Sequence, residues 1–281
     1  MKPTVKTDPP KIVNTGQHRR QPKVREPSEQ YIKLSLQESV AYDPSKETSK
    51  QLIVLDLNGT LVSRTGKRGG YRGMYVRPYH DEFLEYLFQH FTVMVWSSAQ
   101  PHSVNNMCRM FGEYRSQLYK VWDRTHLGLT HAEYHRKSVT IKDLEFIWRD
   151  SSIANDKFDA TNTILLDDSP AKAVLQPYNA IHLATFDHKS SIFRQHGERE
   201  LLHVMRYLET VRRHSNVCSY MRHHPYKSPD ILEDGEKENT TCVYHYPFDS
   251  EDKEKRSLQD LKVDDTQIRD QLSEQLRSMR L

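Results

Sequence analysis

The sequence predicts an α/β fold with a Rossmann-like, doubly wound parallel sheet, and three observations lead to this prediction. Short apolar runs, typical of strands buried on both faces, occur at 52–55, 93–96 and 163–166. Between these runs, apolar residues recur at the spacing of amphipathic helices. Each run also ends in polar residues, as strands do where they leave a sheet. Strands that alternate with helices in this way form a parallel sheet with right-handed crossovers.

The elements follow one another in a regular order. The first strand, 52–55, leads into Asn58-Gly59, which is turn chemistry, and residues 61–76 form a Gly- and Arg-rich loop. Pro78 is placed to start the first helix. The remaining predicted elements are a strand at 93–96, a helix at 101–111, a helix at 144–148, a strand at 163–166, a weaker strand at 180–183 and a closing helix at 201–211. No insertion is long enough to form a large cap domain.

Composition predicts how the 281 residues are divided. A hydrophobic share of 36% is low for a chain of this length that is globular throughout. We therefore expect a disordered arm over residues 1–48, one domain over 49–213 and a polar tail over 214–281. Spaced apolar residues in the tail indicate an amphipathic helix at 265–280, which is either a docking helix for a partner protein or a frayed end.

Charge and cysteine usage restrict the functional classes. A formal net charge of +3 is too small to indicate nucleic-acid binding. Cys108, Cys218 and Cys242 are sparse and irregularly spaced, which fits a reducing compartment and gives no disulfide or zinc pattern. No apolar run predicts a membrane span. We expect a protein of the nucleus or cytoplasm, because early prolines disfavour a mitochondrial transit helix.

Polar clusters follow three of the predicted strands. They are Asp56–Thr60, Ser97-Ser98 and Asp167–Ser169. The carboxyl ends of strands in an open α/β sheet converge on one crevice, so we expect these clusters to form one site. A carboxylate there can attack phosphorus if a cation neutralises the crowded charge. Mg²⁺ prefers such oxygen ligands, and Lys142, which precedes the acidic strand, can balance the remaining charge.

These segments resemble the haloacid dehalogenase (HAD) superfamily, in the branch of small C-terminal-domain phosphatases and NLI-interacting-factor-like proteins. The run Leu55-Asp56-Leu57-Asn58-Gly59-Thr60-Leu61 is similar to its first motif, Asp-x-Asp-x-Thr. Further similar segments follow in the order of the family, at 76–84, 95–99, 141–144, 166–170 and 176–181. The resemblance implies a HAD-like fold and a phosphoserine or phosphothreonine protein or peptide as substrate.

The resemblance also implies catalytic roles. Asp56 would be the nucleophile that forms an aspartyl-phosphate, and Thr60 would brace its loop. Ser97 would donate a hydrogen bond to a phosphate oxygen, while Lys142 would contact both the phosphate and Asp56.

The same resemblance implies a Mg²⁺ site. Its ligands would be the Asp56 carboxylate, the backbone carbonyl of Asn58 and the acidic pair after the third strand. Asp168 is assigned as a direct ligand, and Asp167 as a ligand that acts directly or through water.

Basic residues of the Gly- and Arg-rich loop are candidates for substrate binding. Arg64 and Arg68 lie between the first motif and the first helix, where they would overhang the crevice. They would either guide a phosphorylated or acidic partner or belong to a solvated loop.

One residue departs from the family pattern. Active phosphatases have a second aspartate in the first motif, which protonates the leaving oxygen and later activates water, and Asn58 stands at that position. An amide cannot exchange this proton, and losing general acid–base catalysis costs about 10²- to 10⁴-fold in rate. Two hypotheses follow: a Mg²⁺-dependent phosphoprotein phosphatase weakened by Asn58, and a catalytically impaired scaffold or binding module.

Overall fold

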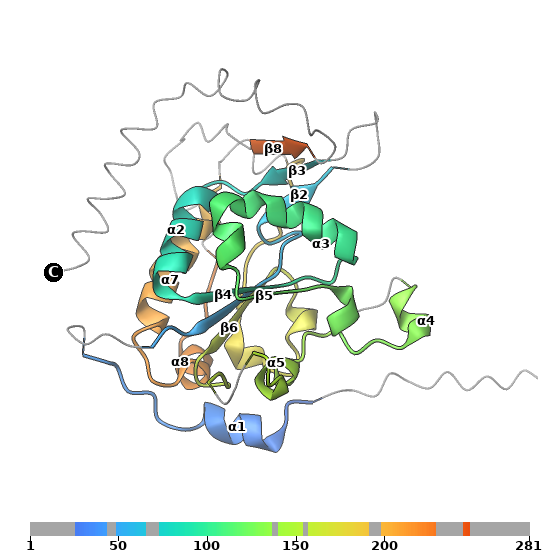
Figure 1. The fold of residues 1–281 in the computed structure, drawn as a ribbon. Coiled ribbons are helices and arrows are strands. Elements are labelled where there is room, and N and C mark those ends of the chain that lie inside the picture. The colour runs from blue at the N-terminus through green and yellow to red at the C-terminus, as the bar shows by residue number, and fades with distance from the viewer. Residues whose placement is uncertain are drawn as a thin grey trace, which may run out of the picture.

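The computed structural model describes residues 26–43, 49–65, 73–136, 140–153, 157–190, 198–228 and 244–247. Within these ranges a five-stranded parallel sheet has the order β5-β4-β1-β6-β7 (Figure 1). Its strands are β1 (Leu52–Leu55), β4 (Thr92–Trp96), β5 (Lys120–Trp122), β6 (Thr163–Asp167) and β7 (Ala180–His182). The predicted doubly wound parallel sheet is thereby confirmed.

The central strand β1 is buried on both faces. Leu55 pairs with Val95 of β4 on one side and with Leu166 of β6 on the other. Ile53 and Leu55 point into one hydrophobic cluster, and the alternate residues of β1 point into a second cluster on the opposite face. This alternation explains why the strand is a continuous apolar run rather than an alternating one.

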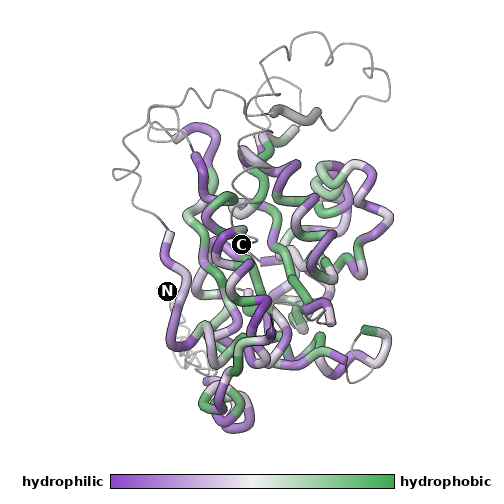
Figure 2. Tube along the Cα trace, turned by 90° about the vertical axis from the view of Figure 1, so that its left-hand side faces the viewer, coloured by the Kyte–Doolittle hydropathy of each residue, from purple (hydrophilic) through white to green (hydrophobic). Residues whose placement is uncertain are grey.

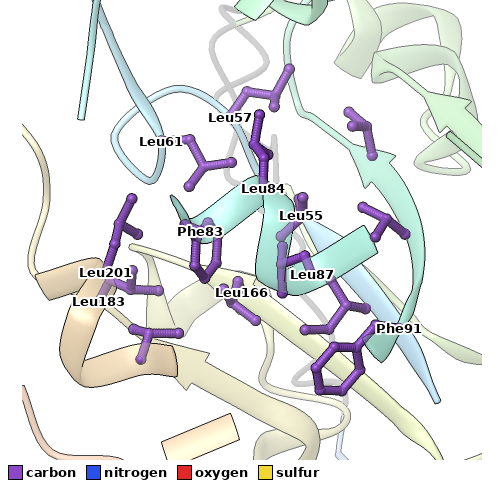
Figure 3. Close-up of a cluster of buried hydrophobic side chains, with 14 of the residues drawn as sticks. Leu55, Leu57, Leu61, Phe83, Leu84, Leu87, Phe91, Leu166, Leu183 and Leu201 are labelled. Carbon is purple, nitrogen blue, oxygen red and sulfur yellow. The ribbon is translucent and has the colours of Figure 1, made fainter. Parts of the chain in front are cut away.

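Helices cover both faces of the sheet. The first cluster is covered by α2 (His80–His90), α3 (Pro101–Met107) and α7 (Glu200–Val211). Phe83 and Leu87 of α2 pack there near Leu55 and Leu201 (Figure 3). The second cluster is covered by α5 (Glu145–Arg149). Hydrophobic and hydrophilic residues are interspersed along the coiled segments of the chain in Figure 2, as expected when one side of each helix is buried.

Short elements connect these layers. They are the 3₁₀ helices η1 (Cys108–Gln117), η2 (Arg124–His126), η3 (Pro170–Lys172) and η4 (Pro177–Asn179), and the helix α4 (His131–Tyr134). None of the helices in the described ranges is long and apolar enough to cross a bilayer.

Two predicted helix boundaries differ from the structure. The helix α2 begins at His80 rather than at Pro78, because Tyr79 before it adopts a left-handed φ of 61°. The predicted helix 101–111 is divided at Met107, after which the chain tightens into η1. Within η1, Gly112 has a φ of 52°, which interrupts regular helix geometry.

The Gly- and Arg-rich segment forms a hairpin rather than a simple loop. The strands β2 (Val62–Arg64) and β3 (Gly73–Val76) pair antiparallel, and β8 (Tyr244–Pro247) adds to β3 in a separate three-stranded sheet. The prediction of a loop over 61–76 is therefore wrong at its two ends. Between β1 and α2 the described residues form this hairpin and no cap domain. Arg68, which falls between β2 and β3 in the sequence, lies outside the described residues.

Two helices lie where the sequence predicts an arm and a tail. The helix α1 (Glu29–Ser35) packs against α8 (Val217–His223) at the lower end of the molecule in Figure 1. Tyr31 of α1 is 2% exposed, and its hydroxyl oxygen accepts a hydrogen bond of 2.8 Å from the backbone N–H of Tyr178. The predictions of a disordered arm over 1–48 and of a domain that ends at 213 are wrong for these helices. Both are too short for sequence periodicity to reveal, and tertiary packing stabilises them. The predicted helix 265–280 and Cys242 lie outside the described residues.

Candidate active site

Three carboxylates meet at the carboxyl end of the sheet. Asp56 follows β1, Asp167 ends β6, and Asp168 follows it directly. Because β1 and β6 are neighbouring parallel strands, one oxygen from each carboxylate lies within 4.8 Å of the other two. Asp56 and Asp167 are 1% and 0% exposed. Two buried negative charges and a partly buried third at this spacing require cations close by.

Lys142 is the first of these cations. It is fully buried, and its Nζ donates hydrogen bonds to Asp56 Oδ1 at 2.9 Å and to Asp167 Oδ2 at 2.6 Å. Its backbone N–H donates to the carbonyl of Lys172 at 2.8 Å, which anchors the segment before α5 to η3. Lys142 therefore holds Asp56 and Asp167 in fixed relative positions.

Lys172 is a second cation, and it is not among the candidate site residues predicted from the sequence. Its Nζ lies 2.8 Å from Asp167 Oδ1, 3.3 Å from Asp56 Oδ2 and 3.6 Å from Asp168 Oδ1. The signal in the sequence was spacing: Lys172 follows Asp168 by four residues, and a turn that starts at Pro170 brings such residues to the same side.

Burial and charge move the pKa values of the acidic pair in opposite directions. Burial tends to raise the pKa of Asp167, but the ammonium groups of Lys142 and Lys172 outweigh it and hold that pKa below its usual value. Burial raises the pKa of Asp168, and Lys172 and the Thr185 hydroxyl offset this only in part. Burial also tends to lower the pKa of Lys172, but the carboxylates of Asp56 and Asp167 outweigh it and raise that pKa.

The loop after β1 is shaped to bring Asp168 close. The Thr60 hydroxyl donates to Asp56 Oδ2 at 3.4 Å and accepts from the backbone N–H of Asp168 at 3.1 Å. Gly59 has a φ of +90°, and a Cβ at this position would clash with Asp168 Oδ2. Only glycine combines this conformation with such a close approach.

Arg77 connects this loop to two other segments through hydrogen bonds. Its guanidinium is 1% exposed and donates hydrogen bonds to the carbonyl of Thr60 at 2.8 Å, to the carbonyl of Ala184 at 2.9 Å and to Glu198 Oε1 at 2.9 Å. Thr185, next to Ala184, donates to Asp168 Oδ2 at 2.9 Å. Arg77 and Thr185 are thus positioning residues, and neither is among the candidate site residues predicted from the sequence.

The remaining candidate residues lie around this centre. The Asn58 side-chain oxygen accepts a hydrogen bond of 2.9 Å from Nε of Arg64, an exposed residue at the end of β2. Ser97 follows β4, beside β1, and is 1% exposed. Its hydroxyl oxygen accepts from the backbone N–H of Ala99 at 3.3 Å. The structure brings Asn58, Arg64 and Ser97 to the carboxyl end of the sheet, where Asp56 lies.

The donor set fits Mg²⁺ by its chemistry. All three clustered side chains are carboxylates, which this hard cation prefers, and their spacing allows one ion to contact them together. Soft ligands such as cysteine sulfur, which would favour other metals, are missing from this cluster.

Comparisons with known proteins agree with this arrangement. The model of a family described as "NLI interacting factor-like phosphatase" matches residues 51–218, a stretch that contains every residue of the carboxylate cluster and both lysines. An uncharacterised FCP1 homology domain-containing protein of Schizosaccharomyces pombe is 34% identical over 192 residues, which cover 64% of this chain and 78% of that protein.

Several more distant relatives are larger proteins. The ubiquitin-like domain-containing CTD phosphatase 1 of Drosophila melanogaster is 26% identical over 184 residues, which cover 64% of this chain. This chain spans about half the length of these ubiquitin-like domain-containing relatives. The solved structure of Fcp1, an essential RNA polymerase II CTD phosphatase, covers 70% of this chain and 57% of its own, with 12% identity and a TM-score of 0.38. Because this structural similarity is low, the description of the fold rests on the sheet order given above and not on this comparison.

Proposed function

Because the chain belongs to the NLI interacting factor-like phosphatase family, we propose that it is a Mg²⁺-dependent phosphoprotein phosphatase that works through an aspartyl-phosphate on Asp56. One observation carries this proposal. The Asp56 carboxylate, at the end of the central strand, lies within bridging distance of two further carboxylates and in contact with two lysines. This arrangement can accept a divalent ion and a phosphate dianion at the same place.

The proposed metal ligands are the side chains of Asp56, Asp167 and Asp168 and the backbone carbonyl of Asn58. A bound Mg²⁺ would withdraw charge from the phosphate and reduce its repulsion from the carboxylates. Lys142 would hold the Asp56 carboxylate in the direction of attack and share in neutralising the phosphate. Ser97, at the end of the neighbouring strand, is proposed to donate a hydrogen bond to a phosphate oxygen.

The chemical step has two halves. An oxygen of Asp56 forms a bond to phosphorus while the bond from phosphorus to the substrate oxygen breaks, and water then cleaves the aspartyl-phosphate to release phosphate. The departing serine or threonine oxygen needs a proton. Asn58 cannot supply it, so we expect aryl phosphates, whose leaving groups are better, to react faster than phosphoserine.

We propose a phosphorylated protein or peptide as the substrate. Support comes from relatives whose names describe CTD phosphatases and from the absence of a cap domain over the described site. Arg64, exposed beside Asn58, is proposed to guide the phosphorylated segment, and Arg68 is its proposed partner. The nucleus or cytoplasm remains the proposed location, in keeping with the free thiols of Cys108 and Cys218.

The test compares the purified wild type with Asp56→Asn on an aryl phosphate and on a phosphoserine peptide, each with and without Mg²⁺. We expect Mg²⁺-dependent phosphate release by the wild type and a loss of at least about 10³-fold in the variant, as for removal of a nucleophile. Asp159→Asn is the matched control, because Asp159 is exposed and caps a turn before β6. Equal release by the wild type and Asp56→Asn would refute the proposed function.

A second candidate function is a binding module that keeps the fold without efficient turnover. The amide of Asn58, hydrogen bonded to Arg64, is the observation that favours it. Asn58→Asp separates the two hypotheses. A phosphatase that lacks only its general acid should gain about 10²- to 10⁴-fold on the phosphoserine peptide and less on the aryl phosphate.

A second substitution, at Arg64, makes this experiment more discriminating. Its guanidinium would lower the pKa of the introduced carboxyl and keep it ionised, which weakens it as an acid. The double variant Asn58→Asp with Arg64→Met should therefore exceed the single variant in kcat, which is measured at saturating substrate because Arg64 is also the proposed guide for the phosphorylated segment. No gain in either protein, with folding and Mg²⁺ binding intact, would favour the binding module.

A further inference from the structure

The position of Lys172 within the acidic cluster is unusual. Its ammonium group lies within 3.6 Å of an oxygen of Asp56, of Asp167 and of Asp168. These are the three side chains proposed to bind Mg²⁺. Among the ion pairs of the described residues, Lys172 is the cation that reaches all three.

Lys142 and Lys172 divide the carboxylate oxygens between them. Lys142 contacts Asp56 Oδ1 and Asp167 Oδ2, whereas Lys172 contacts Asp56 Oδ2 and Asp167 Oδ1. Lys142 is fully buried, so its ammonium group cannot leave without opening the core. The Lys172 side chain is 17% exposed and stands on the short helix η3 at the edge of the site. A flexible four-carbon stem in this position can turn toward solvent.

We propose that Lys172 is a tethered cation that holds the place of Mg²⁺ in the metal-free protein and must leave the cluster when the metal binds. The inference rests on the proposed function, because it takes Asp56, Asp167 and Asp168 as the metal ligands. It assigns to Lys172 a role in setting metal affinity, which differs from the role of Lys142 in positioning the nucleophile.

Charge explains why Lys172 and Mg²⁺ exclude each other from the acidic cluster. The three carboxylates carry three negative charges, and the two ammonium groups reduce the net charge of the cluster to −1. A divalent ion that entered with Lys172 in place would share the same oxygens with a positive group a few ångströms away, and such like charges repel strongly at low dielectric. Without Lys172 the cluster would carry a charge of −2 and attract Mg²⁺ more strongly.

The variant Lys172→Met tests the proposal, because methionine keeps most of the stem and removes the charge. Isothermal titration calorimetry with Mg²⁺ should give a dissociation constant about tenfold or more below that of the wild type, as expected when an opposing charge is removed. Lys50→Met is the matched control, since the Lys50 ammonium contacts the carbonyl of Phe88, in the α2 segment, and not the acidic cluster. Its Mg²⁺ affinity should equal that of the wild type.

Thermal unfolding provides a readout that does not depend on activity. Without metal, Lys172→Met should melt below the wild type, because Asp56 and Asp168 lose a positive neighbour. Saturating Mg²⁺ should raise its melting temperature by more than that of the wild type, since tighter binding stabilises more.

Chemical modification of the wild type tests the proposal even if the Lys172→Met protein does not fold. Amine acylation followed by mass spectrometry should modify Lys172 slowly without metal and faster with Mg²⁺, relative to Lys50. Faster acylation supports displacement, whereas unchanged or slower acylation contradicts it.

The outcomes separate this proposal from the proposed function. If the wild type binds Mg²⁺ and the folded Lys172→Met protein binds it no more tightly, the tethered cation is refuted and the phosphatase proposal stands. If neither protein binds Mg²⁺, the proposed metal site is wrong and the role of Lys172 falls with it.

Discussion

The two ends of the parallel sheet are built in opposite ways. At the carboxyl end, three carboxylates and two lysines are crowded together, and Gly59 has no room for a side chain. At the amino end, α1 and α8 close the domain with the aromatic ring of Tyr31, the thiol of Cys218 and the stacked ring of Tyr178. Here the charged group of Arg222 lies 4.7 Å from the Tyr178 ring centroid and donates to the Ser35 hydroxyl.

The two ends of the sheet therefore serve different purposes: the carboxyl end is suited to binding and chemistry, and the amino end to stabilising the fold. Buried charges contribute little net stability, because desolvation offsets much of their attraction, but they can bind a metal and a phosphate. Apolar and aromatic burial stabilises the fold without offering carboxylates that could bind a metal. Substitutions at the carboxyl end should therefore affect both metal binding and stability, whereas those at the amino end should affect stability alone.

Lys142→Met should have the largest effect on stability. It leaves Asp56 and Asp167 without their buried partner, and breaking a buried ion pair costs about 3–5 kcal/mol. Urea unfolding in the presence of a chelator measures this loss, and Mg²⁺ should reduce it. The control Lys50→Met should stay within about 0.5 kcal/mol of the wild type. A loss as small as that of the control would contradict the view that Lys142 neutralises the cluster.

Tyr31→Ala tests the opposite end. Truncating a buried aromatic residue costs about 3 kcal/mol, and the same urea experiment measures it. Mg²⁺ affinity should not change, because α1 lies at the other end of the sheet from Asp56. Tyr31→Phe removes only the acceptor for the N–H of Tyr178 and should cost less, about 1–2 kcal/mol. A change in Mg²⁺ affinity would show that the two ends are coupled.

Gly59→Ala should cost about 1–3 kcal/mol and weaken Mg²⁺ binding, because a Cβ there would displace the Asp168 carboxylate. Gly112→Ala is a matched control. Gly112 also has a positive φ, +52°, but a Cβ at this position meets nothing within 4 Å. The control therefore measures backbone strain alone, and its Mg²⁺ affinity should equal that of the wild type. Equal Mg²⁺ affinity in both variants would argue against Asp168 as a ligand.

The smallest expected effect is a difference in the rate of thiol labelling between Cys108 and Cys218. Burial raises the pKa of both Cys108 and Cys218 to about 12, so at pH 8 almost none of either thiol is ionised, whereas an unfolded thiol with a pKa of about 8.5 is partly reactive. In a Cys242→Ser background we expect slow labelling of both until a denaturant is added. Cys218 should react first, because α8 packs at the edge of the domain and Cys108 in its main core. Rapid labelling of Cys108 in the native protein would contradict this ranking.

The sequence revealed the central strands because each is buried on both faces. The run 52–55 has no polar residue to confuse the pattern, and 163–166 is similar. The strand β5 escaped prediction because it lies at the sheet edge, where Lys120 and Val121 remain partly exposed. The hairpin strand β2 escaped because Ser63 and Arg64 are typical of loops. The helix α1 has seven residues and depends on α8, which lies far away in the sequence.

The acidic residues of the candidate site could be found because they follow strands directly. Asp56 and Asp167 take their positions from β1 and β6, which the hydrophobic pattern identifies. Lys172 and Arg77 could not be assigned in this way, because their contacts depend on where η3 and Glu198, just before α7, lie relative to the site. Local spacing shows that Lys172 lies near Asp168, but not that it reaches Asp56.

The docking of α1 has a practical consequence for work on this domain. The stretch matched by the family, residues 51–218, starts after α1 and ends inside α8. A recombinant fragment trimmed to that stretch would lack the helix that covers Tyr178 and would cut α8 after its second residue. We expect such a fragment to aggregate on expression, whereas one that starts near residue 26 and extends to residue 228 keeps both helices whole.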